Sequence, residues 1–328
     1  MKVLVTGATG YVGHSLTMAL ARQGNEVNIL VRNPYSVFIP RHRHIRVFTG
    51  DITDKTSILP AMKGCERVFH TAALVHPFAS KPAAFYHINT EGTRHVMDVA
   101  LQTGVEKLVY TSSCGVIGPS QDEPLNEKDA CVTGFKMDYD LSKKMGEDIV
   151  FEYAKKGINA VVVYPSKIYG PGNVSHSFTA NAVIEKFLKN RLAFIPSPGA
   201  YKVCFAFIDD IINGHLLAME KGKSGEKYIL GGTNISYLDF FERILTLSSC
   251  KGRIIQLSKN TIKVWACLQM LKNRIAGGHL SITRGSIDYV FNNYTFSSEK
   301  AIIELGYKIT SLDEALRKTI LFLNKKTN

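Results

Sequence analysis

The stretch that most constrains the fold lies at the N-terminus, where Lys2–Thr6 is followed by Gly7-Ala8-Thr9-Gly10-Tyr11-Val12-Gly13. The short valine-containing run predicts a buried strand, and the glycines at three-residue spacing open a helical apolar periodicity. Gly7 allows the turn, Gly10 lets the backbone approach a pyrophosphate, and Gly13 lets the helix pack on the strand. Unpaired amides at the helix start would face the anion. A glycine turn alone is a weak motif. Its interpretation as a dinucleotide-binding turn depends on its place in a longer alternation of strands and helices.

The first half of the chain alternates apolar, β-branched runs with helical patterns. We expect further strands at residues 26–32, 45–48, 67–70, 107–110 and 160–163, with helices at 55–62, 83–102 and 138–156. This alternation predicts an α/β fold with a doubly wound parallel sheet of the Rossmann type, whose ligands bind beyond the carboxyl ends of the strands.

The composition shifts after Gly170. Pro171-Gly172-Asn173 and Pro196-Ser197-Pro198-Gly199 punctuate a region with helical patterns at 180–189, 209–219 and 237–248 and fewer clear strands. We therefore expect a dinucleotide-binding domain over residues 1–170, completed by about 201–235. A smaller substrate-binding domain is expected over residues 171–328.

Composition excludes several classes of protein. With 45% hydrophobic and 21% charged residues the chain has ordinary soluble composition, without an apolar run long enough for a membrane span. The N-terminus shows no signal-peptide pattern, and the six cysteines form no Cys-x-x-Cys pair. We therefore expect free thiols and a cytoplasmic location. Ligand spacing for a metal is absent, so no metal is expected.

The net charge of +12 comes largely from two concentrations of basic residues. Arg41-His42-Arg43-His44 with Arg46 is one, and residues 251–288 hold seven Lys or Arg against the single acid Asp288. Neither is interleaved with aromatics as in nucleic-acid-binding proteins, so no nucleic-acid partner is expected. For the second concentration, a solvated face or attraction of an anionic substrate are the two interpretations.

A second group of residues, at and after the end of the fifth predicted strand, has the side chains needed for catalysis. The fifth strand ends in Thr111-Ser112-Ser113, and Tyr139 and Lys143 follow four residues apart on a helix, where they share a face. An ammonium one turn away favours the phenolate and should lower the pKa of Tyr139 toward a range useful for proton transfer. A serine hydroxyl can donate to a substrate oxygen as charge develops there. Spacing favours Ser113, although Thr111 or Ser112 could take this role.

Together these motifs resemble the extended short-chain dehydrogenase/reductases. The matching stretches span nearly the whole chain: Thr6–Gly13, Gly50–Thr53, His70–Ala73, Asn89–Thr93, Tyr110–Ser113, Tyr139-x-x-x-Lys143, Tyr169–Gly172, Phe207–Asp210, Gly225–Gly231 and Leu305–Tyr307. The chain most resembles the branch of dihydroflavonol-4-reductase-like and 3β-hydroxysteroid-dehydrogenase-like enzymes, and less closely the nucleotide-sugar epimerases.

The resemblance implies roles for individual residues. Ser113, Tyr139 and Lys143 would be catalytic, with Tyr139 and Lys143 also at the cofactor. The remaining cofactor site would comprise Gly7, Thr9, Gly10, Tyr11, Val12 and Gly13 around the pyrophosphate, Asp51 and Ile52 at the adenine, Ala72 and Ala73 near the ribose, Thr111, and Pro165 and Ile168 against the nicotinamide. A homodimer through the helices at 83–102 and 138–156 is also implied.

Cofactor preference can be argued from the end of the second strand. An acid there would bond the ribose 2′-hydroxyl of NAD, whereas Arg accommodates a 2′-phosphate. The strand ends Leu30-Val31-Arg32-Asn33 without an acid. The sequence therefore favours NADP(H) over NAD(H), with Arg32 as the phosphate partner and Arg41 or Arg43 assisting. The alternative is that Arg32 is a solvated residue at a strand end.

Two departures from the family bear on the substrate. Tyr164 stands where many relatives have Arg, and Val203-Cys204 stand where nucleotide-sugar enzymes commonly have Arg. This favours reduction of a less charged, partly apolar ketone or aldehyde, or oxidation of the matching alcohol. A pocket wall is expected from residues 74–80, 131–137, 173–178 and 260–290. The alternatives are an NAD-dependent nucleotide-sugar epimerase or dehydratase, and a non-catalytic cofactor-sensing protein.

Overall fold

A computed structural model describes residues 1–75, 82–172, 180–266 and 284–327. Its centre is a seven-stranded sheet in the order β10-β6-β5-β4-β1-β2-β3, with every neighbouring pair parallel. The strands are β1 (Lys2–Thr6), β2 (Glu26–Val31), β3 (Ile45–Thr49), β4 (Arg67–His70), β5 (Lys107–Thr111), β6 (Ala160–Pro165) and β10 (Lys227–Leu230). The expected α/β fold with a doubly wound parallel sheet is confirmed.

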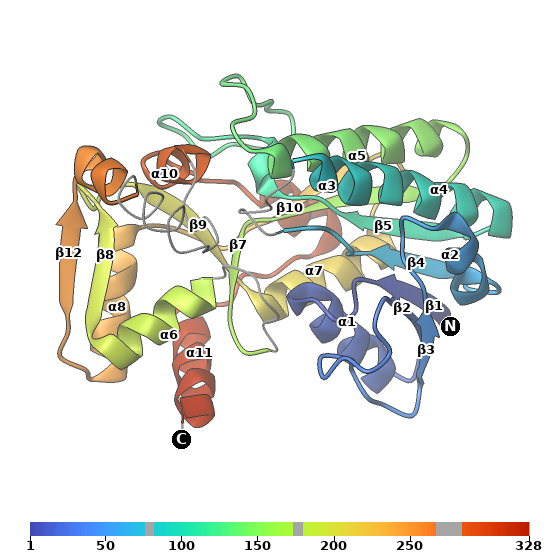
Figure 1. Cartoon of the computed structure of the whole chain (residues 1–328), viewed down its shortest axis with the longest axis horizontal. Coiled ribbons are helices and arrows are strands. Elements are labelled where there is room, and N and C mark those ends of the chain that lie inside the picture. The colour runs from blue at the N-terminus through green and yellow to red at the C-terminus, as the bar shows by residue number, and fades with distance from the viewer. Residues whose placement is uncertain (76–81, 173–179, 267–283, 328) are drawn as a thin grey trace, which may run out of the picture.

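Helices cover both faces of this sheet, as Figure 1 shows. On one face lie α1 (Tyr11–Arg22) and α7 (Ile208–Lys221); on the other lie α2 (Lys55–Met62), α4 (Gly92–Thr103) and α5 (Asp138–Lys155). Side chains alternate between the two cores, so Val3 and Val5 pack with α1 while Leu4 packs with α2. Because both faces are buried, the strands are continuously apolar rather than alternating.

The long helix expected over 83–102 has a different internal form. The structure has α3 (Ala83–Phe85), the π-helix η1 (Tyr86–Glu91) and then α4 in unbroken succession. Within η1 the Asn89 amide bonds both backbone groups of Leu74 and the Ser142 hydroxyl. A wide turn that meets such distant partners is invisible to a 3.6-residue periodicity and is typical of functional sites.

The second half of the chain holds more strands than its sequence pattern suggested. A three-stranded sheet runs β11-β9-β7 and a two-stranded sheet runs β12-β8. These strands are β7 (Lys167–Tyr169), β8 (Leu192–Pro196), β9 (Lys202–Phe207), β11 (Thr233–Ser236) and β12 (Arg253–Leu257). The helical segments around them are α6 (Ala180–Asn190), α8 (Tyr237–Ser248), α10 (Arg284–Val290), η3 (Ala301–Leu305) and α11 (Leu312–Thr327), with the single turn η2 (Cys114–Val116) after β5.

Two elements of this second half return to the main sheet. α7 packs against α1 and the strands β5 and β6, and β10 pairs with β6 at the edge. The division into domains at residue 170 stays a prediction. Of the helices that the structure describes, none is long and apolar enough to cross a bilayer.

Close packing of α5 on the sheet and on η1 depends on Gly146. A Cβ at this position would lie 2.5 Å from the Tyr110 hydroxyl and 2.8 Å from the Asn89 carbonyl oxygen. We expect Gly146→Ala to lower the free energy of unfolding by about 1–3 kcal/mol, because overpacking outweighs the gain in helix propensity. Urea denaturation measures this.

Gly214 on α7 is the matched control, since the three atoms nearest to its added Cβ all belong to the Leu230 side chain, the first at 2.6 Å. A side-chain end can move where a backbone carbonyl cannot. Gly214→Ala should therefore destabilise less than Gly146→Ala, and the reverse order would contradict the packing argument.

Candidate active site

The glycine turn after β1 is a site of close backbone approach. Gly7 has φ +77°, and a Cβ there would lie 2.7 Å from the backbone of Ala72 beyond β4. A Cβ on Gly13 would lie 2.2 Å from the Gly7 carbonyl oxygen. The turn, the start of α1 and the end of β4 are therefore in contact, as the sequence predicts for Gly7 and Gly13.

The start of α1 fits an anionic group. Its N-cap, Gly10, makes no side-chain capping bond, and its first turn holds no acid. The first amides of a helix need acceptors, and a phosphate oxygen can supply them. Thr9 and Val12 are partly exposed on this turn. These residues fit the pyrophosphate of a dinucleotide.

Tyr11 links the glycine turn to a distant segment of the chain through its hydroxyl. Its hydroxyl donates to the Gly170 carbonyl at 2.6 Å and accepts from the Asn181 amide at 3.1 Å. Asn181 also pairs with both backbone groups of Gly170. The glycine turn is thereby joined to the segment after β7, across 159 residues of sequence. Asn181 was missed by the sequence analysis because no local pattern marks it.

The residues predicted at the adenosine end lie at neighbouring strand ends. Arg32 directly follows β2, and Asp51 follows β3, whose Thr49 pairs with Val31. Arg32 is exposed and forms no ion pair among the residues that the structure describes. The Asp51 carboxylate accepts from the amide and hydroxyl of Thr53.

The remaining predicted residues at the carboxyl edge occupy distinct positions. Ile52 is buried beneath Gly92, whose Cβ would lie 2.7 Å from it. Ala72 and Ala73 follow β4 and are partly exposed. Pro165 ends β6 and Ile168 lies in β7, half-buried against the core.

The structure brings Tyr139 and Ser113 together. Tyr139 is the second residue of α5, and Ser113 is the N-cap of the turn η2 that follows β5. Ser113 is close enough to Tyr139 to lower the pKa of its phenol as a side-chain partner, and the Ser113 oxygen accepts from the Gly115 amide at 3.1 Å. The two alternative hydroxyls are engaged elsewhere: Thr111 bonds the His215 ring at 2.9 Å, and Ser112 bonds Glu147. This favours Ser113 over Thr111 and Ser112.

Lys143 lies one turn further along α5 and is almost fully buried, with 2% of its surface exposed. Its ammonium lies 4.1 Å from the ring centre of Tyr110. Burial lowers the pKa of Lys143 to about 7, although the nearby Glu147 carboxylate raises it. The Lys143 ammonium therefore faces the electron-rich ring of Tyr110 and feels the Glu147 carboxylate, and it forms no ion pair with a described residue.

The expectation that Lys143 lowers the pKa of Tyr139 is wrong for this structure. Burial raises the pKa of Tyr139 well above its usual value, and Asp140 raises it further, against the hydrogen bond from Ser113. The phenol is therefore neutral. Helical spacing places an ammonium one turn from the phenol, but it does not reveal how much solvent the phenol loses on burial.

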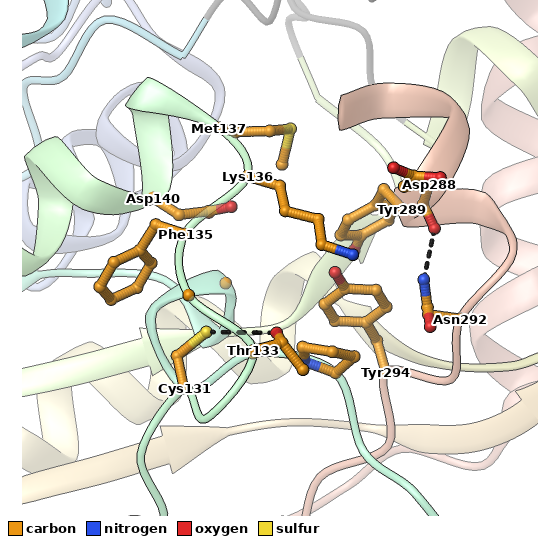
Figure 2. A pocket seen from close by; sticks show the side chains of 14 residues that line it. Cys131, Thr133, Phe135, Lys136, Met137, Asp140, Asp288, Tyr289, Asn292 and Tyr294 are labelled. Atoms are coloured by element: carbon orange, nitrogen blue, oxygen red, sulfur yellow. Dashed lines mark hydrogen bonds between the residues drawn. The ribbon is translucent and has the colours of Figure 1, made fainter. Parts of the chain in front are cut away.

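A pocket opens beside these groups between the segment before α5 and α10. Its walls include the expected stretch 131–137, Asp288 and Tyr289, and its empty space, open mouth included, is about 370 Å³. Figure 2 shows Asp140 and Lys136 pointing into the space bounded by Tyr289 and Tyr294. The other expected wall segments, 76–80, 173–178 and most of 260–290, lie wholly or partly outside the described residues.

Asp140 is a functional candidate that the sequence analysis missed. It is 8% exposed, and burial raises its pKa to about 7. A Cβ on Gly115 would lie 2.0 Å from its Oδ1, so only glycine at 115 leaves room for this carboxyl beside Ser113. The sequence feature that could have revealed Asp140 is its position directly after Tyr139 in the Tyr-x-x-x-Lys motif. Among the described residues, no group of His, Cys, Asp and Glu could hold a metal ion.

Burial of Lys143 gives a pH-dependent stability. The unfolded chain restores its usual pKa of 10.5, so the folded state loses stability as pH falls from about 10.5 to about 7, and the loss is complete below that. We expect Lys143→Met to raise the free energy of unfolding by about 1–3 kcal/mol at pH 6.5, because a buried charge is removed. The gain should shrink at pH 10. Urea denaturation at both pH values measures it.

Lys155→Met is the matched control, because Lys155 is exposed at the end of the same helix. Its effect should be small and equal at both pH values. A gain from Lys143→Met that does not change with pH would contradict the burial argument.

Comparison with known proteins gives consistent matches. Residues 3–231 match the model of the NAD dependent epimerase/dehydratase family. The sterol demethylase protein B of Methylococcus capsulatus is 34% identical over 235 residues, which cover 71% of this chain and 70% of that protein. A putative dihydroflavonol 4-reductase of Synechocystis is 28% identical and covers 96% of this chain, with 92% of that protein matched. A solved epimerase of Methanothermobacter thermautotrophicus superposes with a TM-score of 0.83 at 25% identity, covering 99% and 93% of the two chains.

These matches confirm the resemblance drawn from the motifs, including its dihydroflavonol-reductase-like character. The family model covers both the glycine turn and the Tyr-x-x-x-Lys helix. The chain therefore belongs to the NAD dependent epimerase/dehydratase family, and it is an NAD(P)-dependent oxidoreductase of the extended short-chain dehydrogenase/reductase type.

Proposed function

We propose that the protein reduces a ketone or aldehyde, or oxidises the matching alcohol, with NADP(H) through Ser113, Tyr139 and Lys143. The observation that carries this proposal is the meeting of the Ser113 and Tyr139 side chains, close enough for Ser113 to lower the pKa of Tyr139, one helical turn from the buried Lys143. Two hydroxyls at one point can bind one carbonyl oxygen. The pocket lined by residues 131–137, Asp140 and Tyr289 opens next to these groups.

The roles follow from the chemistry of each side chain. When bound, reduced nicotinamide supplies the hydride. Ser113 donates to the carbonyl oxygen, and the neutral phenol of Tyr139 gives its proton to the same oxygen as negative charge develops. Lys143, on the same face of α5, orients the ribose. The protein itself therefore positions the substrate and the cofactor and supplies the proton.

The preference for NADP(H) is argued from Arg32. Its exposed guanidinium follows β2, where the chain continues with Asn33 rather than an acid. A 2′-phosphate there would meet a cation that no described residue pairs with, and the end of β2 offers no carboxylate to repel it. Arg41 and Arg43, in the connection between β2 and β3, are also exposed and would assist.

A nucleotide-sugar epimerase or dehydratase is the second candidate, favoured by the likeness to the solved epimerase. It would use the same three side chains with NAD retained through the cycle. The absence of Arg ahead of Phe205 argues against it, because the buried Val203 and Cys204 stand there and cannot clamp a diphosphate. Tightly bound NAD in the purified protein would favour this candidate.

We also propose a cytoplasmic homodimer. The five cysteines that the structure describes are free thiols, as suits a reducing compartment. Leu101 on α4 and Met145 on α5 are exposed apolar side chains, 48% and 40% accessible, on the two helices through which relatives of this type are expected to pair.

Removal of the Tyr139 hydroxyl tests the chemistry. We expect Tyr139→Phe to lower kcat for carbonyl reduction by about 10²- to 10⁴-fold, the usual contribution of a general acid, with little change in cofactor affinity. Turnover is followed by NADPH oxidation across a panel of ketones and aldehydes, and cofactor binding by fluorescence titration.

Tyr86→Phe is the matched control, since the Tyr86 hydroxyl donates to Asp138 at the start of the same helix, outside the proposed site. It should leave kcat within about twofold of wild type. Full activity in Tyr139→Phe would remove Tyr139 from the mechanism.

The cofactor preference is tested at Arg32. We expect Arg32→Ala to weaken NADPH binding by about tenfold or more while NADH binding stays unchanged, because only the 2′-phosphate contact is lost. Arg46→Ala is the control, an exposed arginine within β3 paired in register with Asn28, away from the strand end. An unchanged ratio of the two affinities in Arg32→Ala would assign the preference elsewhere.

A further inference from the structure

A lysine without a partner lies at the boundary between the predicted nicotinamide residues and the substrate pocket. Lys167 is in β7, between Pro165 and Ile168 in sequence, and pairs in register with Phe205 of β9. Its ammonium lies 5.7 Å from the ring centre of Tyr237 and 5.4 Å from that of Tyr289. No ion pair or hydrogen bond to its ammonium is found in the part of the chain that the structure describes.

Tyr237, whose ring Lys167 faces, carries a second unpartnered group. Its hydroxyl is fully buried without a hydrogen-bond partner among the residues that the structure describes, and the residue is 7% exposed. A buried hydroxyl without a partner destabilises a protein by about 1–3 kcal/mol, so its retention needs an explanation. Tyr294 raises the pKa of Tyr237, and the ring of Tyr294 stacks on that of Tyr289 with their centres 4.1 Å apart. The orphan donor, the ammonium and two pocket-lining tyrosines therefore form one cluster.

The acids near this cluster do not neutralise the ammonium. Asp288 is paired with Lys259 at 2.7 Å, and Lys136 lowers its pKa from the other side. Asp140 acts on Tyr289 and Tyr294, but burial alone accounts for the lowered pKa of Lys167, which remains about 8. At neutral pH the cluster therefore carries an uncompensated positive charge together with an unused O–H donor.

We infer that Lys167 and the Tyr237 hydroxyl form a subsite for a carboxylate carried by the substrate, at the pocket wall made by Tyr289 and Tyr294. One cation and one neutral donor match a monoanion with two oxygens, whereas a phosphate dianion is usually held by bidentate arginine. Lys167 is partly exposed, so an anion can reach it, and the aromatic rings beside its ammonium displace part of the surrounding water, which strengthens its attraction for an anion. This inference rests on the proposed function, because it adds a substrate class to the same pocket.

The test is a binding measurement that needs no turnover. The wild-type protein with oxidised NADP⁺, which cannot reduce a ketone, is titrated calorimetrically with 4-acetylbenzoate and with its neutral amide counterpart, 4-acetylbenzamide. We expect the carboxylate to bind at least tenfold more tightly. Lys167→Met should abolish this difference. Lys202→Met, which removes an exposed lysine from the adjacent strand β9, should preserve it.

Tyr237→Phe separates ligand recognition from a purely structural role. Loss of a hydroxyl that has no partner should raise the melting temperature of the ligand-free protein, yet it should weaken 4-acetylbenzoate binding severalfold. This variant also keeps the inference testable if Lys167→Met fails to fold. A buried hydroxyl with no ligand role would give the first effect without the second, which overturns its part in the subsite.

Other outcomes contradict the inference directly. Equal affinity of wild type for acid and amide overturns it, as does a preference that survives in Lys167→Met. Tighter binding of 4-acetylphenyl phosphate than of 4-acetylbenzoate would replace the carboxylate by a phosphate. A loss of NADP⁺ affinity in Lys167→Met without a loss of discrimination would move Lys167 to the cofactor. Failure of the proposed reduction is a separate result, because it leaves the acid–amide comparison intact.

Discussion

The site depends on the parallel register of one sheet. Because β1, β4, β5 and β6 all run in the same direction, the residues that follow them share one edge. The glycine turn, Ala72, Ser113 and Pro165 stand at that edge through backbone connectivity alone. Helix α5 then adds Tyr139 and Lys143 from above the β5 end, and it can do so only because Gly146 lets it settle against Tyr110 and η1.

Two lysines at this edge, Lys143 buried and Lys167 partly buried, form no ion pair with the residues that the structure describes. Lys143 faces the ring of Tyr110, and Lys167 lies near the rings of Tyr237 and Tyr289. A ring face stabilises a desolvated cation by about 2 kcal/mol, less than a carboxylate would, so both ammonium groups keep binding capacity for an incoming group. A protein selected for stability alone would have paired or replaced them, and their retention at one edge is typical of a binding site.

The parts of the fold that follow from local patterns were predictable from the sequence. The bounds of β4, α2 and α8 match the expected residues because their apolar periodicity and turn residues are clear. Strands β8 and β12 were not foreseen, since both carry exposed residues and show no clean alternation. The π-turn at Asn89 and the link from Asn181 to Tyr11 depend on partners far away in sequence, so no local pattern reveals them.

At the site itself, the order of motifs located Ser113, Tyr139 and Lys143 but misjudged their electrostatics. Spacing on a helix states which groups are neighbours, whereas a pKa depends on how much water remains around them. Burial was not readable from the motif, so the raised pKa of Tyr139 and the buried carboxyl of Asp140 emerged only from the structure. The same reason hid Lys167, whose sequence context shows a charged residue but not its unpaired state.

These protonation states bear on the direction of the proposed reaction. A phenol held neutral by burial and by Asp140 is ready to give a proton to a developing alkoxide, which is the step that reduction requires. Oxidation of an alcohol needs the phenolate, and the phenolate needs a positive charge close to Tyr139. Lys143 is the one catalytic group that could supply this charge, but with its pKa near 7 it is only partly protonated at neutral pH. The ligand-free site is therefore poised for proton donation, and a shift toward oxidation requires a rise in the Lys143 pKa, which a bound anion would produce.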